Sequence, residues 1–435
     1  MTLTEAAFWT KRFGIIALVF LGVSFITLII IFGSATTPPP PPEYQQGNFA
    51  CTETKEEFLE NALTIPSLDV LPESEMRFNL QTETGKYDNL PSVVNVYRYT
   101  DLGQRLNSQA DAKVLAKKMG FDPEKIVRKG TTDYIWVNNN NQKSLQISAR
   151  DLNFTLKTEI SRIRNLRKEA DLPSEGEAVS LAINALRSLG VLDSEYAKLN
   201  KVFLIDINPD GSYSEADSLI NAELIRVDFL RKVPLITIPS NLVGVEDIVR
   251  TLERKDMTYE MGTQVINNER VEVYNFSTLL TYQNPLKSNI SVYVGPKDKS
   301  NEVLQEIYQI DFRSWSLEVE KCGTYELITP STALQKIQNG EGSLVFLNAN
   351  NDEVEEYIPQ NVKEFNVMDI YITYYEGLFE QQYLQPVYMI EGQAILSNGN
   401  EADFHIYYPA ISYETLDDKR ELEKAPVEES GGILP

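Results

Sequence analysis

The longest apolar run in the chain, residues 14–33, reads GIIALVFLGVSFITLIIIFG and contains no ionisable side chain. About 20 residues in a helix, at about 1.5 Å each, span the roughly 30 Å hydrocarbon core of a bilayer. Lys11 and Arg12 precede the run, and the next positive charge is Lys55. Because positive charge is enriched on the cytoplasmic side, the pattern predicts a single-pass anchor with a cytoplasmic N-terminus and an extracytoplasmic bulk.

The same run has a second interpretation, a secretory signal peptide that is cut near Ser34-Ala35. The apolar region of a signal peptide is normally about 7–15 residues long, so the length favours a retained anchor. Prolines occupy every position from 38 to 42. Consecutive prolines favour a stiff polyproline helix, and we interpret residues 34–50 as a stalk.

Beyond the stalk, three segments place apolar side chains at helical spacing and end at a glycine. In the first, Ala112, Leu115, Ala116 and Met119 recur at i, i+3, i+4 and i+7, and Gly120 follows. The predicted helices cover residues 108–119, 173–189 and 329–339.

Runs rich in β-branched and aromatic residues, several of them alternating with polar residues, accompany these helices. They lie at residues 133–137, 144–148, 201–206, 223–230, 290–296, 304–312, 367–374, 385–390 and 402–408. The sequence therefore predicts an α+β fold in which an N-terminal transmembrane helix is followed by two similar lobes. Each lobe is expected to be an antiparallel sheet covered by short helices.

This interpretation divides the chain into consecutive parts. They are a cytoplasmic N-terminus (1–13), the transmembrane anchor (14–33), a proline-rich stalk (34–50), a first α+β lobe (51–233), an irregular connecting region (234–284), a second α+β lobe (285–413) and a disordered tail (414–435).

Charge limits the partners that the chain can bind. The sequence contains 40 Lys and Arg against 63 Asp and Glu, for a formal charge of −23. Such a surface repels nucleic acid and anionic lipid headgroups, so no nucleic-acid partner is predicted. It would tolerate cations, basic peptides or cationic wall polymers, but a solvated surface that resists aggregation is the favoured explanation of the charge.

The only cysteines are Cys51 and Cys322. In an oxidising compartment they could form one disulfide, whose long loop would contribute about 4–5 kcal/mol in the chain-entropy model. Two buried free thiols are the alternative, because a sequence does not show which cysteines are close in space.

Catalytic and metal-binding motifs are scarce. The single histidine, His405, lies on the same predicted strand face as Asp403, but such a pair is ordinary on a strand surface. The sequence has no second histidine, no CxxC, no HExxH and no glycine-rich phosphate loop. We therefore predict no catalytic residue, no metal and no cofactor.

A weak echo of a calcium loop occurs at Asp206, Asn208, Asp210 and Gly211. A tight turn with Pro209 at its second position explains the same residues, and the turn is the favoured interpretation.

Tyrosine is dense near the C-terminus, and this residue is common in recognition surfaces because it combines area with a polar group. Tyr371, Tyr375, Tyr383 and Tyr407 are the candidate interaction surface. Packing in a sheet core is the alternative for part of the set.

The C-terminal third resembles a known family. The order ITPSTALQKIQNGEG, DIYITYYEGLFEQQYLQPVYMIEGQ and ADFHIYYPAI is similar to the terminal domain of YycH/YycI-type regulators, and the helix-and-sheet units resemble PepSY repeats. The resemblance is strongest over residues 329–412 and weaker over the two-lobe plan. It implies an extracytoplasmic protein on one N-terminal anchor that restrains a sensor kinase in the bacterial envelope.

These observations together predict a membrane-anchored, non-catalytic protein that binds and regulates an envelope partner, either a protein such as a sensor kinase or a wall polymer. One alternative is a hydrolase of envelope polymers, which would need a cleft with two carboxyl groups about 5–9 Å apart. A peptidase inhibitor or chaperone is the other.

Overall fold

The computed structural model describes residues 47–413, apart from residues 49, 53, 76, 89, 101–106, 130–131, 169, 256, 267–268, 300–302, 350–353, 355–356 and 380. The predicted cytoplasmic N-terminus, the anchor at 14–33, most of the stalk and the tail at 414–435 lie outside the described residues. Within the described ranges, no helix has the length and apolar character needed to cross a bilayer.

Two sheets build the described part of the chain, so the predicted α+β class is confirmed at this level. The first sheet has nine strands and only antiparallel pairs. Its spatial order is β3 (Ile126–Lys129), β4 (Asp133–Asn138), β5 (Lys143–Ser148), β6 (Phe154–Thr158), β14 (Ile307–Phe312), β13 (Ile290–Val294), β9 (Leu224–Phe229), β7 (Asn200–Ile207) and β8 (Tyr213–Glu215).

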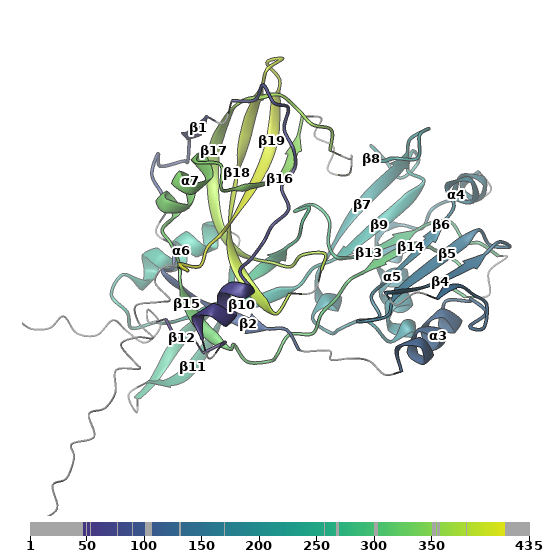
Figure 1. Cartoon of the computed structure of the whole chain (residues 1–435), viewed down its shortest axis with the longest axis horizontal. Helices are drawn as coiled ribbons and strands as arrows, with labels where there is room; N and C mark the ends of the chain where they lie inside the picture. The colour runs from purple at the N-terminus through teal and green to yellow at the C-terminus, as the bar shows by residue number, and fades with distance from the viewer. Residues whose placement is uncertain are drawn as a thin grey trace, which may run out of the picture. The chain divides into compact units, whose positions relative to one another are not determined.

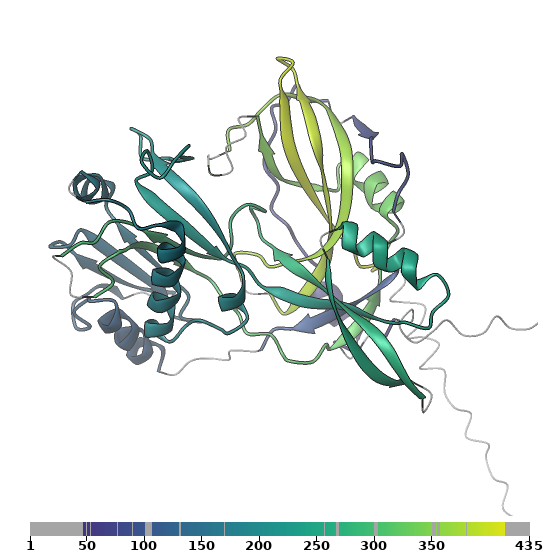
Figure 2. The same ribbon diagram turned by 180° about the vertical axis from the view of Figure 1, so that it is seen from behind.

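Helices cover both faces of this nine-stranded sheet (Figures 1 and 2). On one face α5 (Glu175–Leu189) contacts β9 and β13, and α3 (Ser108–Lys118) contacts β4. On the other face, Ile163 of α4 (Ile160–Arg167) joins a smaller apolar cluster with residues of β7 and β13. Because α4 is short, it covers only part of that face of the nine-stranded sheet, and the rest is left for other contacts.

The helix α5 is the element that the sequence predicts best. Ser174 and Glu177 form a reciprocal capping box at its start, and Gly190 adopts φ 80° at its end. Both ends thus satisfy backbone groups that a helix otherwise leaves unpaired.

The second sheet has ten strands. They are β1 (Phe78–Leu80), β2 (Val93–Arg98), β10 (Lys232–Pro239), β11 (Thr258–Ile266), β12 (Glu269–Thr281), β15 (Gly323–Glu326), β16 (Ser343–Asn348), β17 (Val362–Tyr375), β18 (Tyr383–Leu396) and β19 (Glu401–Pro409). The main path runs β10-β12-β17-β18-β19-β16, and only the β1–β17 and β12–β17 pairs are parallel. The helices that belong to this part are α2 (Lys55–Glu60), α6 (Val245–Arg254) and α7 (Pro330–Gln338). A short 3₁₀ turn, η2 (Tyr196–Lys198), precedes β7 of the nine-stranded sheet.

The two-lobe division predicts that strands pair within one consecutive part of the chain. The observed pairing crosses that division. The β13–β14 hairpin, expected in the second lobe, pairs with β9 and β6 in the nine-stranded sheet. Strands β1 and β2, expected in the first lobe, pair with β17 and β18. Hydrophobic alternation identifies a strand but not its long-range partner, so this arrangement was not visible in the pattern.

The region 234–284, predicted to be an irregular connection with one helix around residues 245–252, is ordered into β10, α6, β11 and β12. The helix α6 lies where it was predicted, and the strands were not predicted. Pro234 and Pro239 weaken the strand signal there, because proline cannot donate a ladder hydrogen bond. The structure accommodates both, since β10 pairs only with β12 at the end of the sheet path and has a register shift next to Pro234.

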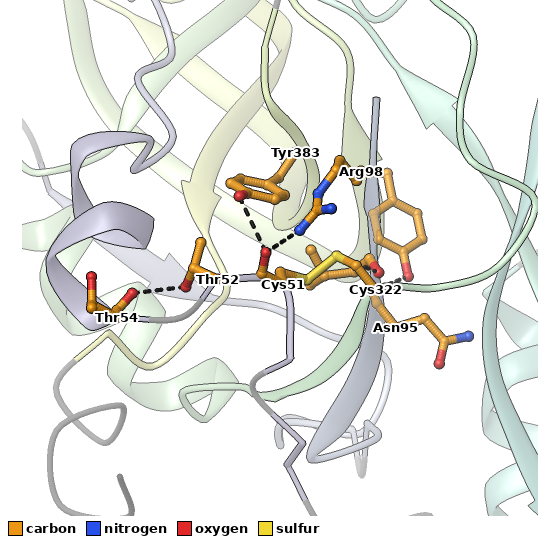
Figure 3. Close-up of a disulfide and its surroundings, with 9 residues drawn as sticks. Cys51, Thr52, Thr54, Asn95, Arg98, Cys322 and Tyr383 are labelled. Atoms are coloured by element: carbon orange, nitrogen blue, oxygen red, sulfur yellow. Dashed lines mark hydrogen bonds between the residues drawn. A yellow bond between two sulfur atoms is a disulfide. The ribbon is translucent and has the colours of Figure 1, made fainter. Parts of the chain in front are cut away.

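The structure contains a disulfide between the two cysteines, which was one of the two predicted alternatives (Figure 3). Cys51 and Cys322 are bonded with their Cα atoms 4.7 Å apart. The Cys51 carbonyl accepts hydrogen bonds from the Arg98 guanidinium and, at 3.3 Å, from the Tyr383 hydroxyl. The start of the folded region is thereby fixed to both β2 and β18.

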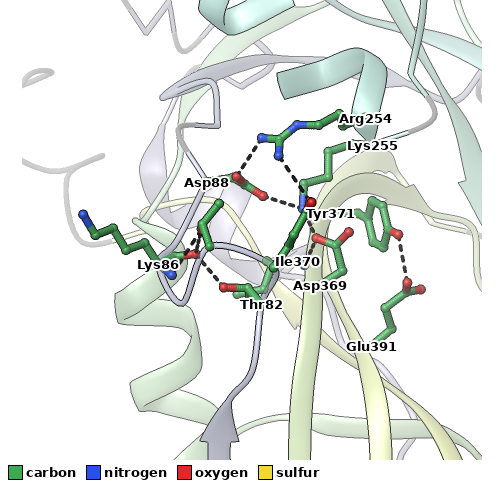
Figure 4. A network of polar contacts seen from close by, with 11 residues as sticks. Thr82, Lys86, Asp88, Arg254, Lys255, Asp369, Ile370, Tyr371 and Glu391 are labelled. Atoms are coloured by element: carbon green, nitrogen blue, oxygen red, sulfur yellow. Dashed lines mark hydrogen bonds and ion pairs between the residues drawn. The ribbon is translucent and has the colours of Figure 1, made fainter. Parts of the chain in front are cut away.

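A polar network fastens the end of α6 to β17 (Figure 4). The Lys255 ammonium, only 4% exposed, lies 2.8 Å from Asp88 and also contacts Asp369, and Arg254 lies 3.0 Å from Asp88. Burial raises the pKa of Asp88, but Lys255 and Arg254 outweigh burial and hold that pKa below its usual value. The buried Lys255 ammonium therefore forms ion pairs with two carboxylates, those of Asp88 and Asp369.

Replacing Lys255 with methionine should lower the free energy of unfolding by about 2 kcal/mol, because two partly buried carboxylates would lose their cation. Chemical denaturation at pH 7 measures the change. The matched control is Arg254→Met, whose side chain is 49% exposed and should cost less than about 1 kcal/mol. Equal losses in the two variants would contradict this account of the network.

Candidate functional site: a cleft lined by both sheets

The predicted tyrosine surface is wrong for three of its four members. Tyr375, Tyr383 and Tyr407 are each at most 1% exposed. Their strands β17, β18 and β19 lie in the middle of the ten-stranded sheet, and other segments cover both faces. Tyr371 is half-buried, and its hydroxyl donates to Glu391 at 2.8 Å. Burial raises the pKa of Tyr375 to about 12, as expected for a core residue.

His405 does not form a dyad with Asp403. Its Nδ1 lies 3.7 Å from Glu391 Oε2 on the neighbouring strand, in register with it. The pair is half-buried.

Residues 208–211 form a tight turn, which was the favoured interpretation over a calcium loop. Gly211 adopts φ 92° and its amide donates to the Asn208 carbonyl at 2.9 Å. The Asp210 carboxylate accepts from the Ser212 amide and hydroxyl at 2.9 and 2.7 Å. Among the residues that the structure describes, no group of three His, Cys, Asp or Glu side chains is placed to hold a metal ion.

The described region contains a cleft of about 580 Å³ that is lined by residues of both sheets. One wall is the face of the nine-stranded sheet, with Tyr213, Arg226, Tyr293 and Asp311. The opposite wall is β16 with the residues that follow it and the β18–β19 turn. From that wall the lining includes Val345, Phe346, Leu347, Asn348, Ala349, Val354, Tyr357, Ile358, Leu396, Asn398 and Asn400.

Strand alternation directs polar side chains into this cleft. On β9, Ile225, Val227 and Phe229 pack against α5 in the main core, so Arg226 and Asp228 point to the other face. The register then aligns Arg226 with Tyr293 and Asp228 with Ser291.

The strand β14 continues the two rows. Gln309 follows Tyr293, and Asp311 follows Ser291. These strands were predicted from the sequence, but their polar rows were not. The signal was present, because ELIRVDFL and IYQIDF each alternate core residues with arginine, aspartate or glutamine.

Arg226 is the most constrained charge in the cleft. Its side chain is 3% exposed and lies 3.1 Å from Asp228, which is 2% exposed. Its guanidinium also donates to the Leu286 carbonyl at 2.9 Å and stacks 4.2 Å from the centre of the Phe203 ring. Burial raises the pKa of Asp228, and Arg226 opposes that shift. These contacts hold the guanidinium in one position.

A second ion pair lies beside the first. Lys287 is 3.1 Å from Asp311, which also accepts from Gln309 at 2.9 Å. The Tyr213 hydroxyl in turn donates to Gln309 at 3.1 Å. Burial lowers the pKa of Lys287, but neighbouring Tyr293 and Asp311 raise it above its usual value. These contacts orient Lys287, Asp311, Gln309 and Tyr213 through one another.

The wall has an excess of positive charge. Its lining includes Arg226, Lys287 and Arg313, but Asp311 is the one carboxylate among the described lining residues. No salt bridge to Arg313 occurs among the described residues, and the formal charge of the whole sequence is −23. Because Arg226 is paired with Asp228 and Lys287 with Asp311, the described residues of this wall carry a net excess of one positive charge, at Arg313.

A buried acid lies behind the cleft, where the chain passes between the sheets. Glu376, which is fully buried, accepts from the Tyr99 hydroxyl at 3.1 Å and the Tyr196 hydroxyl at 3.4 Å. Asn289, which lines the cleft, donates to it at 3.5 Å. Burial raises the pKa of Glu376 to about 7, although Arg231 and these donors oppose the shift.

The arrangement is chemically suited to binding. A glycosidase of the usual kind needs one carboxyl group as an acid and a second as a base or nucleophile. In the described lining, the carboxylate of Asp311 is already engaged by Lys287 and Gln309. What the cleft offers is one cationic, aromatic wall and one aliphatic, amide-rich wall.

Comparison with known proteins gives no family for this chain: no family model and no curated protein matches it. The similarity to YycH/YycI-type regulators and PepSY repeats therefore stays a prediction from sequence.

Proposed function

We propose that this chain is a membrane-anchored extracytoplasmic protein that binds a segment of an envelope partner in the cleft between its two sheets and thereby regulates that partner. The observation that carries the proposal is the cleft itself, because its walls belong to different sheets. A ligand there contacts both sheets at once. The volume of about 580 Å³ lies within the roughly 300–1,000 Å³ typical of ligand sites.

The anchor and the disulfide support the same proposal. An apolar run at 14–33 and a proline-rich stalk would tether the folded region to the membrane. The bond between Cys51 and Cys322 would connect the stalk directly to the sheet. A partner in the same membrane, such as a sensor kinase, would then lie within reach.

A photo-crosslinking amino acid at Ile358 tests the proposal in intact cells of the native host. Ile358 is 66% exposed and lines the cleft, and Val319, which is 99% exposed and is not among its lining residues, is the matched control position. We expect a discrete crosslinked envelope species from position 358 and not from position 319. Equal crosslinking at both positions, or none at 358, would contradict cleft binding.

A further inference from the structure

We infer that two copies of this chain pair edge to edge through β11, as an antiparallel strand pair centred on Gly262. This inference concerns a surface other than the cleft and does not depend on what binds there. Three observations carry it: a strand edge without a partner, a projecting hairpin with exposed apolar side chains, and a residue order that matches its own copy.

The outer edge of β11 lacks a partner over the whole length of the strand. The nine residues from Thr258 to Ile266 pair only with β12, in one continuous register. Within the described residues, no other segment forms a backbone hydrogen bond with β11, and none of its side chains is buried. Such an edge presents a row of N–H and C=O groups that can pair with another strand.

The strand on the other side of β12 shows how an edge is protected. Proteins block edge pairing with proline, lysine or a bulge. The strand β10 has Pro234, Pro239 and a register shift, and the Pro234 carbonyl accepts from the Tyr97 hydroxyl at 2.7 Å. In contrast, β11 contains no proline, no lysine and no register shift, and its one charged residue is Glu260. The edge of β11 therefore lacks these protections.

The hairpin of β11 and β12 projects from the rest of the ten-stranded sheet (Figures 1 and 2). Because β10 pairs with β12 only as far as Val273, residues 264–266 and 269–271 form a ribbon of two strands in the described chain. A ribbon of two strands is only marginally stable in water. Met261 and Val265, which are 53% and 69% exposed, lie on one face of the hairpin. A second β11 would extend the ribbon to four strands and place further side chains beside this apolar row.

The residue order of β11 fits an antiparallel copy of itself. A two-fold axis at Gly262 aligns all nine residues of both strands. The resulting pairs include Tyr259 with Val265, Met261 with Thr263, and Glu260 with Gln264. Apolar side chains thus meet on one face, and each carboxylate faces an amide, so no like charges are opposed. Pairs of this kind stabilise antiparallel strands.

A second copy accounts for these matches because a two-fold interface must be complementary to itself. An axis at Glu260 would instead oppose two carboxylates and shorten the overlap, so the sequence favours one register. The formal charge of −23 opposes contact between whole acidic surfaces. Contact through a projecting hairpin avoids much of that repulsion, because only the hairpins need to meet.

Charge substitutions at Gln264 test the inference in the full-length protein. By symmetry, Gln264→Glu places two carboxylate pairs across the interface, and Gln264→Lys places two ion pairs there. We expect the dimer dissociation constant to rise about tenfold for Gln264→Glu and to fall severalfold for Gln264→Lys. Sedimentation equilibrium in a mild detergent measures the constant, and thermal unfolding checks that each variant is folded.

The matched controls are Gln146→Glu and Gln146→Lys. Gln146 is exposed on β5, which is paired on both sides within the nine-stranded sheet. These variants change the net charge by the same amount away from the proposed interface. They should leave the dissociation constant unchanged.

Disulfide trapping in intact cells tests the register. Two differently tagged copies carry Met261→Cys and Thr263→Cys, which the axis at Gly262 places opposite each other. In the control pair, Val265→Cys replaces Met261→Cys and lies four residues, or about 14 Å, out of register with Thr263→Cys. We expect a disulfide between copies from the first pair and not from the control pair.

Several outcomes would overturn the inference. They are a native protein that stays monomeric at every concentration, the same dissociation constant for Gln264→Glu and Gln146→Glu, and equal trapping in the two cysteine pairs. A disulfide from Thr263→Cys to a different protein, in place of the second copy, would assign the edge to a foreign strand and would also overturn it.

Discussion

Removing the disulfide by replacing both Cys51 and Cys322 with alanine should lower the free energy of unfolding by about 5 kcal/mol. The two cysteines are 271 residues apart. In the chain-entropy model, closing so long a loop lowers the entropy of the unfolded chain more than closing a short loop does. Equilibrium denaturation in urea, with and without a reductant, measures the difference.

The reductant provides the control for this prediction. Reduction of the native protein should reproduce the loss, and the double-alanine variant should not respond to reductant. A variant that unfolds at the same urea concentration as the oxidised protein would show that the bond does not constrain the chain as the structure implies.

Replacing Glu376 with glutamine should remove a decrease in stability that the native protein shows as pH rises from about 4.5 to 7. The folded-state pKa of about 7 lies above the ordinary value of 4.5. Between those values the unfolded chain loses a proton that the folded chain retains, so the native protein becomes less stable as pH rises. Above pH 7 the decrease is complete at about 3 kcal/mol, at about 1.4 kcal/mol per pKa unit.

The neutral amide imitates the protonated acid: its oxygen can accept from Tyr196 and Asn289, which both donate to Oε2 of Glu376, and its NH₂, like the OH of the protonated acid, can donate to the Tyr99 hydroxyl. The variant should therefore equal the native protein near pH 4 and exceed its free energy of unfolding by about 3 kcal/mol at pH 8. Urea denaturation of both proteins across this range measures the difference, which cancels the contribution of other titrating groups such as Asp228. A constant difference at all pH values would contradict burial as the source of the shift.

Local elements were predictable where local signals agree. The helix α5 begins and ends where its capping serine and its glycine place it, because both features act within one turn. The helix α7 follows the same logic, with Thr329 as its capping residue and Gly340 after its end, whereas α3 shares only the glycine, Gly120, and has no side-chain cap. In contrast, β10 was missed because proline penalises a strand locally, and only its position at the end of the sheet path removes the penalty.

The tyrosine prediction failed for a related reason. A strand with alternating residues exposes one of its faces to solvent only when no other segment of the chain covers that face. Tyr375 and Tyr407 lie on covered faces, where their rings stack edge to face 6.0 Å apart. Which face is covered depends on segments far away in the chain, such as the stretch around Ile65 that packs against both rings.

The cleft was beyond sequence reasoning for the same physical reason. Its cationic wall comes from strands near residues 226, 293 and 311, and its aliphatic wall from residues 345–349, 354, 357, 358, 396, 398 and 400. Each strand carries a readable alternation, but the pairing of β13 with β9 is what brings Arg226 and Tyr293 onto one wall. Long-range pairing of this kind depends on the whole fold, and periodicity alone does not encode it.

Filling the cleft tests the central claim most directly. Ala349 lines the cleft and is half-buried, so Ala349→Trp would occupy the space that we assign to the partner segment. With the photo-crosslinking residue at Ile358, intact cells should form the crosslinked envelope species in the presence of Ala349 and lose it in the Ala349→Trp variant at equal protein abundance. A crosslink that persists unchanged after the cleft is filled would contradict binding in the cleft.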